Sequence, residues 1–331
     1  MKTKKLLALI LCLATVLSIL VGCNGTKKEK ILIYTSIEDY VIEDMQPKLK
    51  EKFPDYNIDI QYFSTGDLSA KLLAEGTNTD CDMVYSLEYP YLEKLDKNGV
   101  FANLTDIVDM TVFSDDTNLS DNFLPQCRNG GAIIINTDLL KEKNLPKPTS
   151  YNDLLDSKYK GLISMPNPKS SGTGYMFLLS LINSMGEDAA FDYFDKLSEN
   201  IFQFTTSGSG PINALLQGEA VIALGMTGQA VNKINSESAP LEILFFDEGS
   251  PYSLYGNAII KGRESRDCVK EVFSYLSEDY ANDLCSQFYP EKIFKDKTFT
   301  VKNYPSDIKY SNMSEYTTTE EKERLLAKWK Y

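Results

Sequence analysis

The sequence predicts an α/β protein that folds as two lobes with a cleft between them. Apolar runs typical of buried strands alternate with helical stretches along the first hundred residues, and the same alternation starts again after residue 136. Serine, threonine and glycine make up the loops at four of the strand-to-helix connections. Such alternation predicts parallel sheets, whose ligands bind in the crevice at the carboxyl ends of the strands.

The first part of the pattern predicts lobe 1. Each apolar run is short enough for a strand and is followed by a stretch with helical spacing. The expected elements are strands over residues 31–34, 58–63 and 82–86, and helices over 38–53, 68–75 and 91–97.

The second part predicts lobe 2 by the same reasoning. Gly186 stands where a glycine would end a helix that starts near Thr173, and Pro211 suits the first position of another. The expected strands cover residues 131–136, 162–165, 202–204, 220–224 and 241–246, and the expected helices cover 173–185, 187–198 and 211–217, with further helices at 268–276 and 319–329.

The first 22 residues are expected to be a signal peptide. Three lysines precede an apolar run over residues 6–21, which is shorter than the ~20 residues of a membrane-spanning helix. The run ends in Leu-Val-Gly-Cys, which resembles a bacterial lipobox. Cys23 would then be lipidated and residues 23–30 would form a polar tether. We expect an exported protein that is lipid-anchored to the outer face of the cell membrane; an uncleaved N-terminal anchor is the alternative.

The composition excludes several classes of function. Loss of the three leader lysines changes the formal charge from −13 to −16, which argues against a nucleic-acid partner. The chain has no histidine, so Ser-His-Asp and Cys-His catalysis and imidazole metal sites are excluded. Widely spaced cysteines favour neither a zinc site nor a disulfide-dense scaffold, and we expect no metal and no cofactor. These cysteines are Cys81, Cys127, Cys268 and Cys285.

The four hydroxyl-rich loops supply most of the candidate ligand contacts. Each precedes a helix, so one loop alone is explained by helix capping. Four such loops at comparable positions in two lobes would surround one cleft with helix N-termini, which favours an anion site. The candidates are Thr35, Ser36, Ser64, Thr65, Ser170, Ser171, Gly172, Thr173, Ser207, Gly208 and Ser209.

Carboxylates and tyrosines at other strand ends are candidates for the non-anionic part of a ligand, since an amine would need a counter-charge. Those candidates are Tyr85, Glu88, Glu248 and Tyr252. Glu38 and Asp39 directly follow a hydroxyl loop, but acids in a first helical turn are common partners of the helix dipole and are interpreted so here.

Six segments of the chain, in order over residues 31–262, resemble a known family. They read ILIYTS, FSTGDLSAKLLAEG, GAIIINTDLL, ISMPNPKSSGTGY, TTSGSGPINALLQGEAVIALGM and EGSPYSLYGNAIIKG. The resemblance is to bacterial extracellular solute-binding proteins of ABC importers, in the group that contains ferric-ion, 2-aminoethylphosphonate and hexose-phosphate binders.

This resemblance implies the type II periplasmic-binding-protein fold. Lobe 1 would comprise residues 31–132 and 253–331, with a C-terminal tail free to contact the second lobe, and lobe 2 would comprise residues 133–252. The chain would cross between the lobes near residues 131–136 and 252–260.

The resemblance also bears on the ligand. Iron-binding members use two neighbouring tyrosines, often with histidine or a carboxylate, and the nearest substitute here is Tyr252 with Tyr255. The phosphonate and sugar-phosphate branch carries Ser-Gly-Thr-Gly-Tyr and Ser-Gly-Ser segments like those of this chain, although Thr206 stands where relatives often have histidine. The positions carried over as anion contacts are Ser36, Ser171, Thr173, Ser207 and Ser209.

We therefore expect a monomeric binding protein that captures a phosphonate (2-aminoethylphosphonate-like) or an organic phosphate ester and delivers it to the permease subunits of an ABC importer. A ferric-ion-binding protein is the alternative within the family. An exported hydrolase using Asp247 and Glu248 is an alternative of another class, but adjacent strand residues point to opposite faces. A surface adhesion or signalling module would instead need a broad apolar patch.

Overall fold

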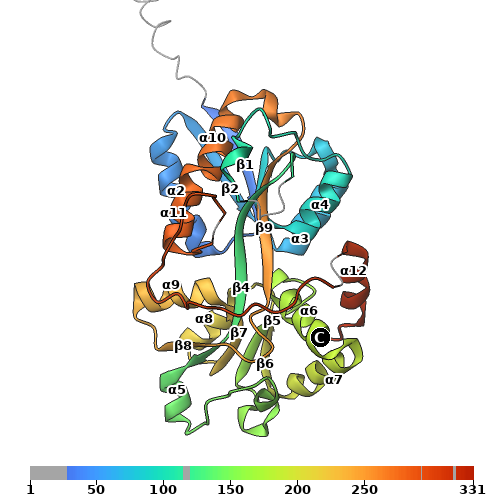
Figure 1. The fold of residues 1–331 in the computed structure, drawn as a ribbon, viewed down its shortest axis with the longest axis vertical. Coiled ribbons are helices and arrows are strands. Elements are labelled where there is room, and N and C mark those ends of the chain that lie inside the picture. The colour runs from blue at the N-terminus through green and yellow to red at the C-terminus, as the bar shows by residue number, and fades with distance from the viewer. Residues whose placement is uncertain (1–27, 115–119, 292, 316–317) are drawn as a thin grey trace, which may run out of the picture.

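The computed structural model describes residues 28–114, 120–291, 293–315 and 318–331, and it shows two α/β lobes joined by long strands (Figure 1). The crossing strands are β4 (Leu124–Asn136) and β9 (Tyr252–Ile259), which overlap the predicted crossing segments. The predicted two-lobed α/β architecture is confirmed.

Lobe 1 has a sheet that is buried on both faces. Along β1, Ile31 and Ile33 belong to one apolar core and Leu32 and Tyr34 to another, because successive side chains point to opposite faces. Parallel pairing places β1 between the other two strands: β1 (Glu29–Thr35), β2 (Tyr56–Tyr62) and β3 (Met83–Glu88). One face is covered by α2 (Asp39–Lys52), α10 (Asp267–Ser277) and α11 (Asp279–Gln287), and the other by α3 (Thr65–Glu75) and α4 (Tyr89–Lys97).

Lobe 2 repeats this design on the far half of β4. Ile133 and Ile135 face one core and Ala132 and Ile134 the other. Its remaining strands are β5 (Ile163–Pro166), β6 (Ile201–Thr205), β7 (Ile222–Met226) and β8 (Leu241–Leu244). Its helices are α5 (Thr137–Glu142), α6 (Gly172–Met185), α7 (Glu187–Leu197), α8 (Gly210–Leu216) and α9 (Thr227–Glu237).

β4 joins the two sheets. Its first half pairs antiparallel with β9, from Leu124 opposite Asn257 to Gly130 opposite Tyr252, and its second half pairs antiparallel with β7 and β8. The strand order is therefore β2-β1-β3-β9-β4-β7-β5-β6, with β8 beside β4. The cleft opens where this continuous path passes from one lobe to the other.

The C-terminal tail contacts lobe 2, which the expected assignment of residues 253–331 to lobe 1 had allowed. After α11 the chain crosses back, and residues around 310 run beside the loop before β9, where the Ser311 amide donates to the Ser250 carbonyl at 2.9 Å. The last helix, α12 (Thr319–Lys328), lies between α4 above and α7 below in Figure 1. Leu325 and Trp329 are buried in the core of lobe 2.

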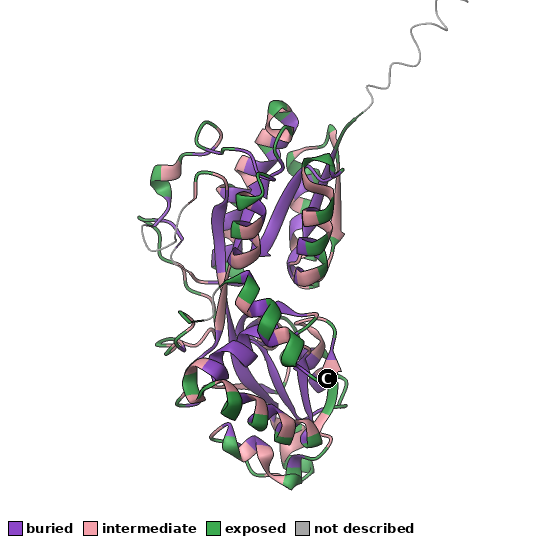
Figure 2. Cartoon of the chain, turned by 90° about the vertical axis from the view of Figure 1, so that its right-hand side faces the viewer, coloured by how far each residue is buried: buried purple, intermediate pink, exposed green. Residues whose placement is uncertain are grey.

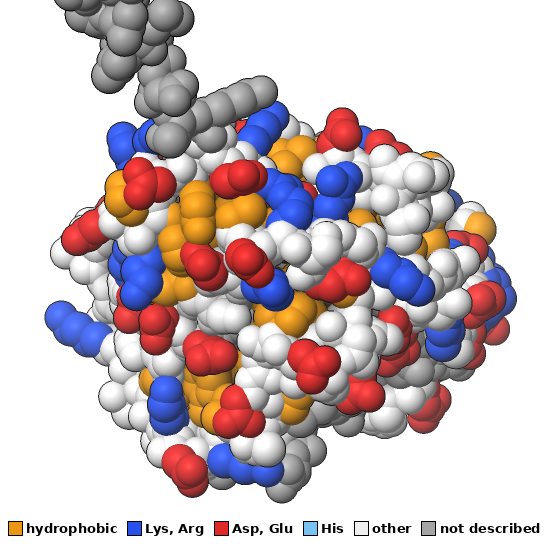
Figure 3. Space-filling view, turned by 90° about the horizontal axis from the view of Figure 1, so that it is seen from above, with side chains coloured by type: hydrophobic (Ala, Val, Ile, Leu, Met, Phe, Trp, Pro, Cys, Tyr) orange, Lys and Arg blue, Asp and Glu red, His pale blue; other side chains and the backbone are white. Residues whose placement is uncertain are grey.

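Burial follows this layering. In Figure 2 the central strands of each lobe are buried, whereas the helices show buried, intermediate and exposed positions; the edge strands β2 and β6 are mostly intermediate or exposed. Lysine, arginine and acidic side chains are interspersed at the outer end of lobe 1 and break up its hydrophobic surface (Figure 3). Within the described ranges, none of the helices has both the length and the apolar character needed to cross a membrane.

Candidate ligand-binding site

A cavity of about 260 Å³ lies between the lobes, and we call it the cleft site. Lobe 1, lobe 2 and strand β9 all contribute to its wall, so its shape depends on how the lobes meet. The lining residues are Ser36, Glu38, Asp39, Tyr62, Ser64, Thr65, Ser170, Ser171, Gly172, Thr173, Thr206, Ser207, Gly208, Ser209, Met226 and Tyr255.

The structure brings ten of the fifteen predicted ligand contacts to this cavity. They come from all four hydroxyl-rich loops, which lie at the carboxyl ends of strands in the two lobes. The ten are Ser36, Ser64, Thr65, Ser170, Ser171, Gly172, Thr173, Ser207, Gly208 and Ser209.

Helix starts surround the cleft site. Four helices of nine residues or more begin at its wall: α2 after Glu38, α3 after Ser64, α6 after Ser171 and α9 after Met226. The first N–H groups of a helix lack intrahelical partners and carry the positive end of the helix dipole. Neither Glu38 nor Met226 makes a side-chain capping bond, so two of these helix starts are not satisfied by a cap.

Two serines do cap helices, with unequal geometry. Ser64 accepts from the Asp67 amide at 3.4 Å and donates to the Asp67 carboxylate at 2.7 Å. The Ser171 hydroxyl accepts from the Gly174 amide at 3.5 Å, which is long against the usual 2.9–3.0 Å. Ser171 therefore lies at a helix start without a strong cap, and the residue also lines the cavity.

The other hydroxyls have specific partners. Ser36 donates to the Ser86 carbonyl at 2.5 Å, and Ser86 has a left-handed backbone with φ 62°. Ser207 and Ser209 lie 3.2 Å apart, hydroxyl to hydroxyl. The loop that carries them approaches α6 closely, because a Cβ on Gly208 would lie 2.4 Å from the Thr173 hydroxyl. Only glycine allows the two lobe 2 loops to meet in this way.

Two carboxylates in the wall set the electrostatics. Half-buried Glu38 accepts from the Asn129 side-chain amide at 3.0 Å and from the Tyr289 hydroxyl at 2.8 Å. Burial raises the pKa of Glu38, and these hydrogen bonds only partly oppose the rise. Burial and then the charges of Glu38 and Asp39 raise the pKa of Tyr62 to about 12.

The charged side chains in the wall are thus both carboxylates, and its positive potential comes from the N-termini of the helices. Among the cavity residues that the structure describes, none is a lysine or arginine. Glu38 and Asp39 are therefore part of the cavity wall and not merely solvated partners of the helix dipole, which corrects their interpretation from sequence.

Sequence reasoning also missed Tyr62, Thr206, Met226 and Tyr255 as lining residues. The position of Glu38 and Asp39, two and three residues after Ser36 at the carboxyl end of β1, was the available signal for those two. Met226 and Tyr255 reach the cavity because β7 and β9 both pair with β4 where it passes between the lobes, and sequence carries no signal of that pairing.

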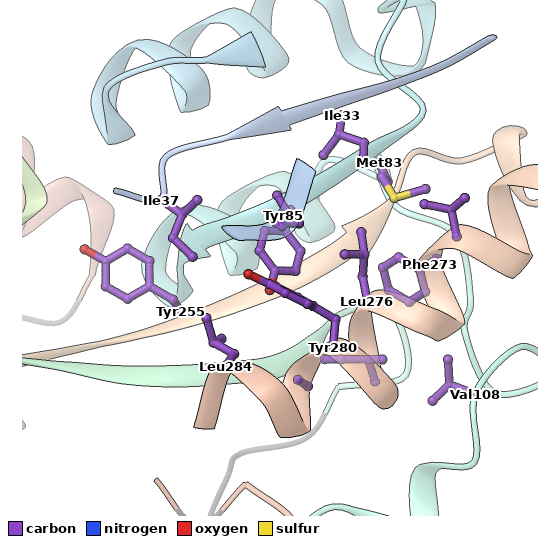
Figure 4. Packing of buried hydrophobic residues seen from close by; sticks show 14 of the residues in the cluster. Ile33, Ile37, Met83, Tyr85, Val108, Tyr255, Phe273, Leu276, Tyr280 and Leu284 are labelled. Atoms are coloured by element: carbon purple, nitrogen blue, oxygen red, sulfur yellow. The ribbon is translucent and has the colours of Figure 1, made fainter. Parts of the chain in front are cut away.

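Three predicted contacts are buried away from the cavity. Thr35 is fully buried and accepts from the Ile37 amide at 3.1 Å. Tyr85 packs in the lobe 1 core with its ring 6.4 Å from that of Tyr280 (Figure 4). Glu88 is paired with Lys322 at 2.8 Å and accepts from the Tyr255 hydroxyl at 3.3 Å, so it lies one hydrogen bond behind the cavity wall.

The other two predicted contacts do not line the cavity either. Tyr252 packs against the guanidinium of Arg128, 4.8 Å from its ring centroid, and against the ring of Tyr310. Glu248 is in the loop that binds the tail, where its carbonyl accepts from the Ser311 hydroxyl at 3.0 Å. Tyr252 and Tyr255 therefore do not converge on one ligand, unlike the tyrosine pair that iron would require.

Of the five cysteines discussed from the sequence, four lie among the described residues. Cys23 lies outside the described residues. Cys81, Cys127, Cys268 and Cys285 are buried free thiols. In the described part of the chain, no three or more cysteine, aspartate or glutamate residues are grouped so as to hold a metal ion.

Comparison with known proteins is consistent with this geometry. The sequence model of a family described as bacterial extracellular solute-binding protein matches residues 78–314. An uncharacterized protein of Haemophilus influenzae is 26% identical over 325 residues, which cover 93% of this chain and 92% of that protein. A putative 2-aminoethylphosphonate-binding periplasmic protein of Salmonella typhi is 27% identical over 241 residues, which cover 70% and 68%.

A solved structure extends the comparison to the fold. The periplasmic binding protein AfuA from Actinobacillus pleuropneumoniae, with exogenous fructose-6-phosphate bound, superposes with a TM-score of 0.76 at 26% identity, over 92% of this chain and 98% of that one. The resemblance seen in the sequence and the type II periplasmic-binding fold are thereby confirmed. The Salmonella and Actinobacillus proteins are named as binding proteins and not as enzymes.

Proposed function

Because this chain belongs to the family of bacterial extracellular solute-binding proteins, we propose that it captures a small phosphonate or phosphate ester that carries an amine, of the 2-aminoethylphosphonate type, for an ABC importer. The single observation that carries this proposal is the combination in one cavity of helix N-termini and hydroxyls with two carboxylates. Such a wall suits a ligand with charges of both signs.

The anionic group would bind to the helix starts of α3 and α6. Backbone N–H groups at helix N-termini and hydroxyls such as those of Ser171 and Thr173 can donate to phosphonate oxygens without a cationic side chain. The close approach of the Gly208 loop to Thr173 brings donors from two loops to one place. We therefore assign the anion to this half of the cavity.

The amine would bind to Glu38 and Asp39. An ammonium group would supply a counter-charge to Glu38, whose carboxylate accepts hydrogen bonds from Asn129 and Tyr289. Burial raises the pKa of Glu38, and a nearby cation would favour its charged form. A hexose phosphate has no such cation and would face two carboxylates. For this reason we favour the amine-bearing ligand over the sugar phosphate, although AfuA was solved with fructose-6-phosphate.

The size of the cavity supports a small ligand. Pockets for drug-sized molecules measure roughly 300–1,000 Å³. The 260 Å³ of the cleft site lies below this range. A two-carbon aminophosphonate is compatible with that volume.

Identification of the ligand retained by the purified protein tests this proposal. The protein is purified without added solute and denatured, and the released small molecules are analysed by mass spectrometry. A melting-temperature screen with 2-aminoethylphosphonate, a hexose phosphate and inorganic phosphate accompanies it. We expect an aminophosphonate or amino phosphate ester to be released or to stabilise the protein most. Stabilisation only by the hexose phosphate would contradict the assignment of the amine.

We propose further that Cys23 anchors the protein by a lipid. The leader pattern and its Leu-Val-Gly-Cys ending support this. Cys23→Ala should release the protein from the membrane fraction while its affinity for ligand stays unchanged, because the cleft site lies in the two lobes. Fractionation of cells that produce each form measures this, with Cys81→Ala as the control that should remain anchored. Full retention of Cys23→Ala in the membrane fraction would contradict the anchor.

A further inference from the structure

We propose that the C-terminal helix α12 clamps the two lobes together and positions Tyr255 in the cleft site, through Lys322 and Glu88. This inference rests on the proposed function only because its test uses the proposed ligand, 2-aminoethylphosphonate, as a probe. The three residues come from α12, from the end of β3 and from β9, and their contacts form a continuous path from the outer helix to the cavity wall.

The clamp begins with the attachment of α12 to lobe 2. Trp329, just after the helix, packs edge-on against Phe194 and Phe204, with ring centroids 5.2 and 5.7 Å away. Glu187 at the start of α7 pairs with Arg324 at 2.9 Å and with Lys328. These contacts fix the helix to lobe 2, so α12 should move with that lobe.

Lys322 reaches from this helix to lobe 1. Its ammonium lies 2.8 Å from the carboxylate of Glu88 and 4.2 Å from the ring centroid of Tyr91, both in lobe 1. On its other side it lies 4.3 Å from the ring centroid of Tyr175 in lobe 2. One cation is thus held between an aromatic ring of each lobe and paired with a lobe 1 carboxylate.

Burial makes this contact sensitive to lobe separation. The side chains of Lys322 and Glu88 are only 4% and 2% exposed. Separating a buried ion pair leaves an uncompensated charge unless water enters, which is strongly unfavourable. A buried pair as such adds little stability over packed apolar residues, so its presence between two lobes points to control of their relative position.

The same carboxylate contacts the cleft site. The second oxygen of Glu88 accepts from the Tyr255 hydroxyl at 3.3 Å. A Cβ on Gly172 would lie 2.2 Å from that oxygen, so the first residue of α6 packs directly on Glu88. Tyr255 and Gly172 both line the cavity. Lys322 is therefore a positioning residue, which acts on the site through Glu88.

The test compares Lys322→Met with Lys94→Met. Lys94 makes the other ion pair from α12 to lobe 1, with Glu323 at 2.9 Å, but there the lysine and the glutamate are 28% and 66% exposed. Spin labels at Lys50→Cys and Lys143→Cys, on exposed positions of the two lobes, report the distance between the lobes. Stopped-flow mixing reports the rate at which 2-aminoethylphosphonate dissociates.

We expect Lys322→Met to shift the ligand-free distances toward longer values and to increase the dissociation rate at least about tenfold, since the closed state loses a buried pair. Lys94→Met should leave both unchanged, because exposed pairs contribute little. The double variant Glu88→Gln/Lys322→Met leaves no isolated buried charge; it should fold and still show the longer distances.

Wild-type distances in both Lys322→Met and the double variant would overturn the clamp. If the wild-type protein bound none of the probe ligand, the proposed function would fail while the distances in the ligand-free protein would still decide the clamp. The two failures are therefore distinguishable.

Discussion

At the scale of single residues, Ser171 distinguishes a helix cap from an anion contact. Its capping bond to the Gly174 amide is 3.5 Å long, and the residue lines the cleft site. Ser171→Asp keeps a good N-cap, so the melting temperature of the ligand-free protein should hold. Binding should weaken by about 1.5–3 kcal/mol or more, because a charge-assisted bond is replaced by repulsion.

Calorimetric titration with 2-aminoethylphosphonate measures this loss. Thr318→Asp is the matched control, because Thr318 caps α12 outside the cavity. It should leave the affinity unchanged. Normal binding by Ser171→Asp would reduce this loop to a helix cap.

Glu38 predicts a pH dependence of binding. In the free protein burial raises its pKa above the ordinary value near 4.5, and an ammonium ligand would lower it again. The complex then holds fewer protons than the free protein. The affinity should therefore rise with pH from about 4.5 up to the raised pKa of Glu38 in the free protein, and it should be constant at higher pH.

Glu38→Gln isolates this effect. The ligand's own titration affects both proteins equally. The ratio of the wild-type affinity to the variant affinity, measured from pH 4.5 to pH 8, therefore reports the titration of Glu38, which involves roughly one proton. The variant should bind more weakly than the wild type at the upper end and equally at the lower end. A ratio independent of pH would remove Glu38 from amine recognition.

At the scale of elements, the loop before α8 depends on its glycine. A Cβ at position 208 would lie 2.4 Å from the Thr173 hydroxyl and 3.3 Å from the Met226 methyl. Gly208→Ala should push this loop away from α6 and weaken binding by roughly tenfold or more, as small misplacements of contacting groups do. Gly66→Ala is the control, because its Cβ would meet nothing closer than 3.8 Å. Equal affinities of the two variants, measured by calorimetry, would contradict the close contact.

The elements also show what the sequence could predict. The four hydroxyl loops were found because strand, hydroxyl and helix follow one another locally, and the chain direction of a parallel sheet carries their ends to one edge. Tyr85 lies within β3 and Tyr252 begins β9, yet one is packed on Tyr280 and the other on Arg128. Which face a residue at a strand end presents depends on bulges such as the one between Val84 and Leu87, which sequence pattern does not reveal.

At the scale of the whole molecule, the tail could not be assigned from local pattern. The apolar spacing of α12 predicts a helix, but Leu325 and Trp329 would suit a groove on either lobe. Their burial in lobe 2 and the reach of Lys322 to Glu88 depend on the tail crossing from lobe 1 to lobe 2 past Ser250. Which lobe a segment joins therefore depends on contacts between residues far apart in the sequence, and the alternation of strands and helices does not predict those contacts.

The central claim is that one cleft recognises an anion and an amine together. Calorimetric titration of the wild-type protein with 2-aminoethylphosphonate and with ethylphosphonate tests it most directly, because the two ligands differ only in the amine. We predict that both bind and that the loss of the amine weakens binding by about 1.5–3 kcal/mol, the contribution of a charge-assisted hydrogen bond. Equal affinities for the two ligands, or no binding of either, would contradict the account.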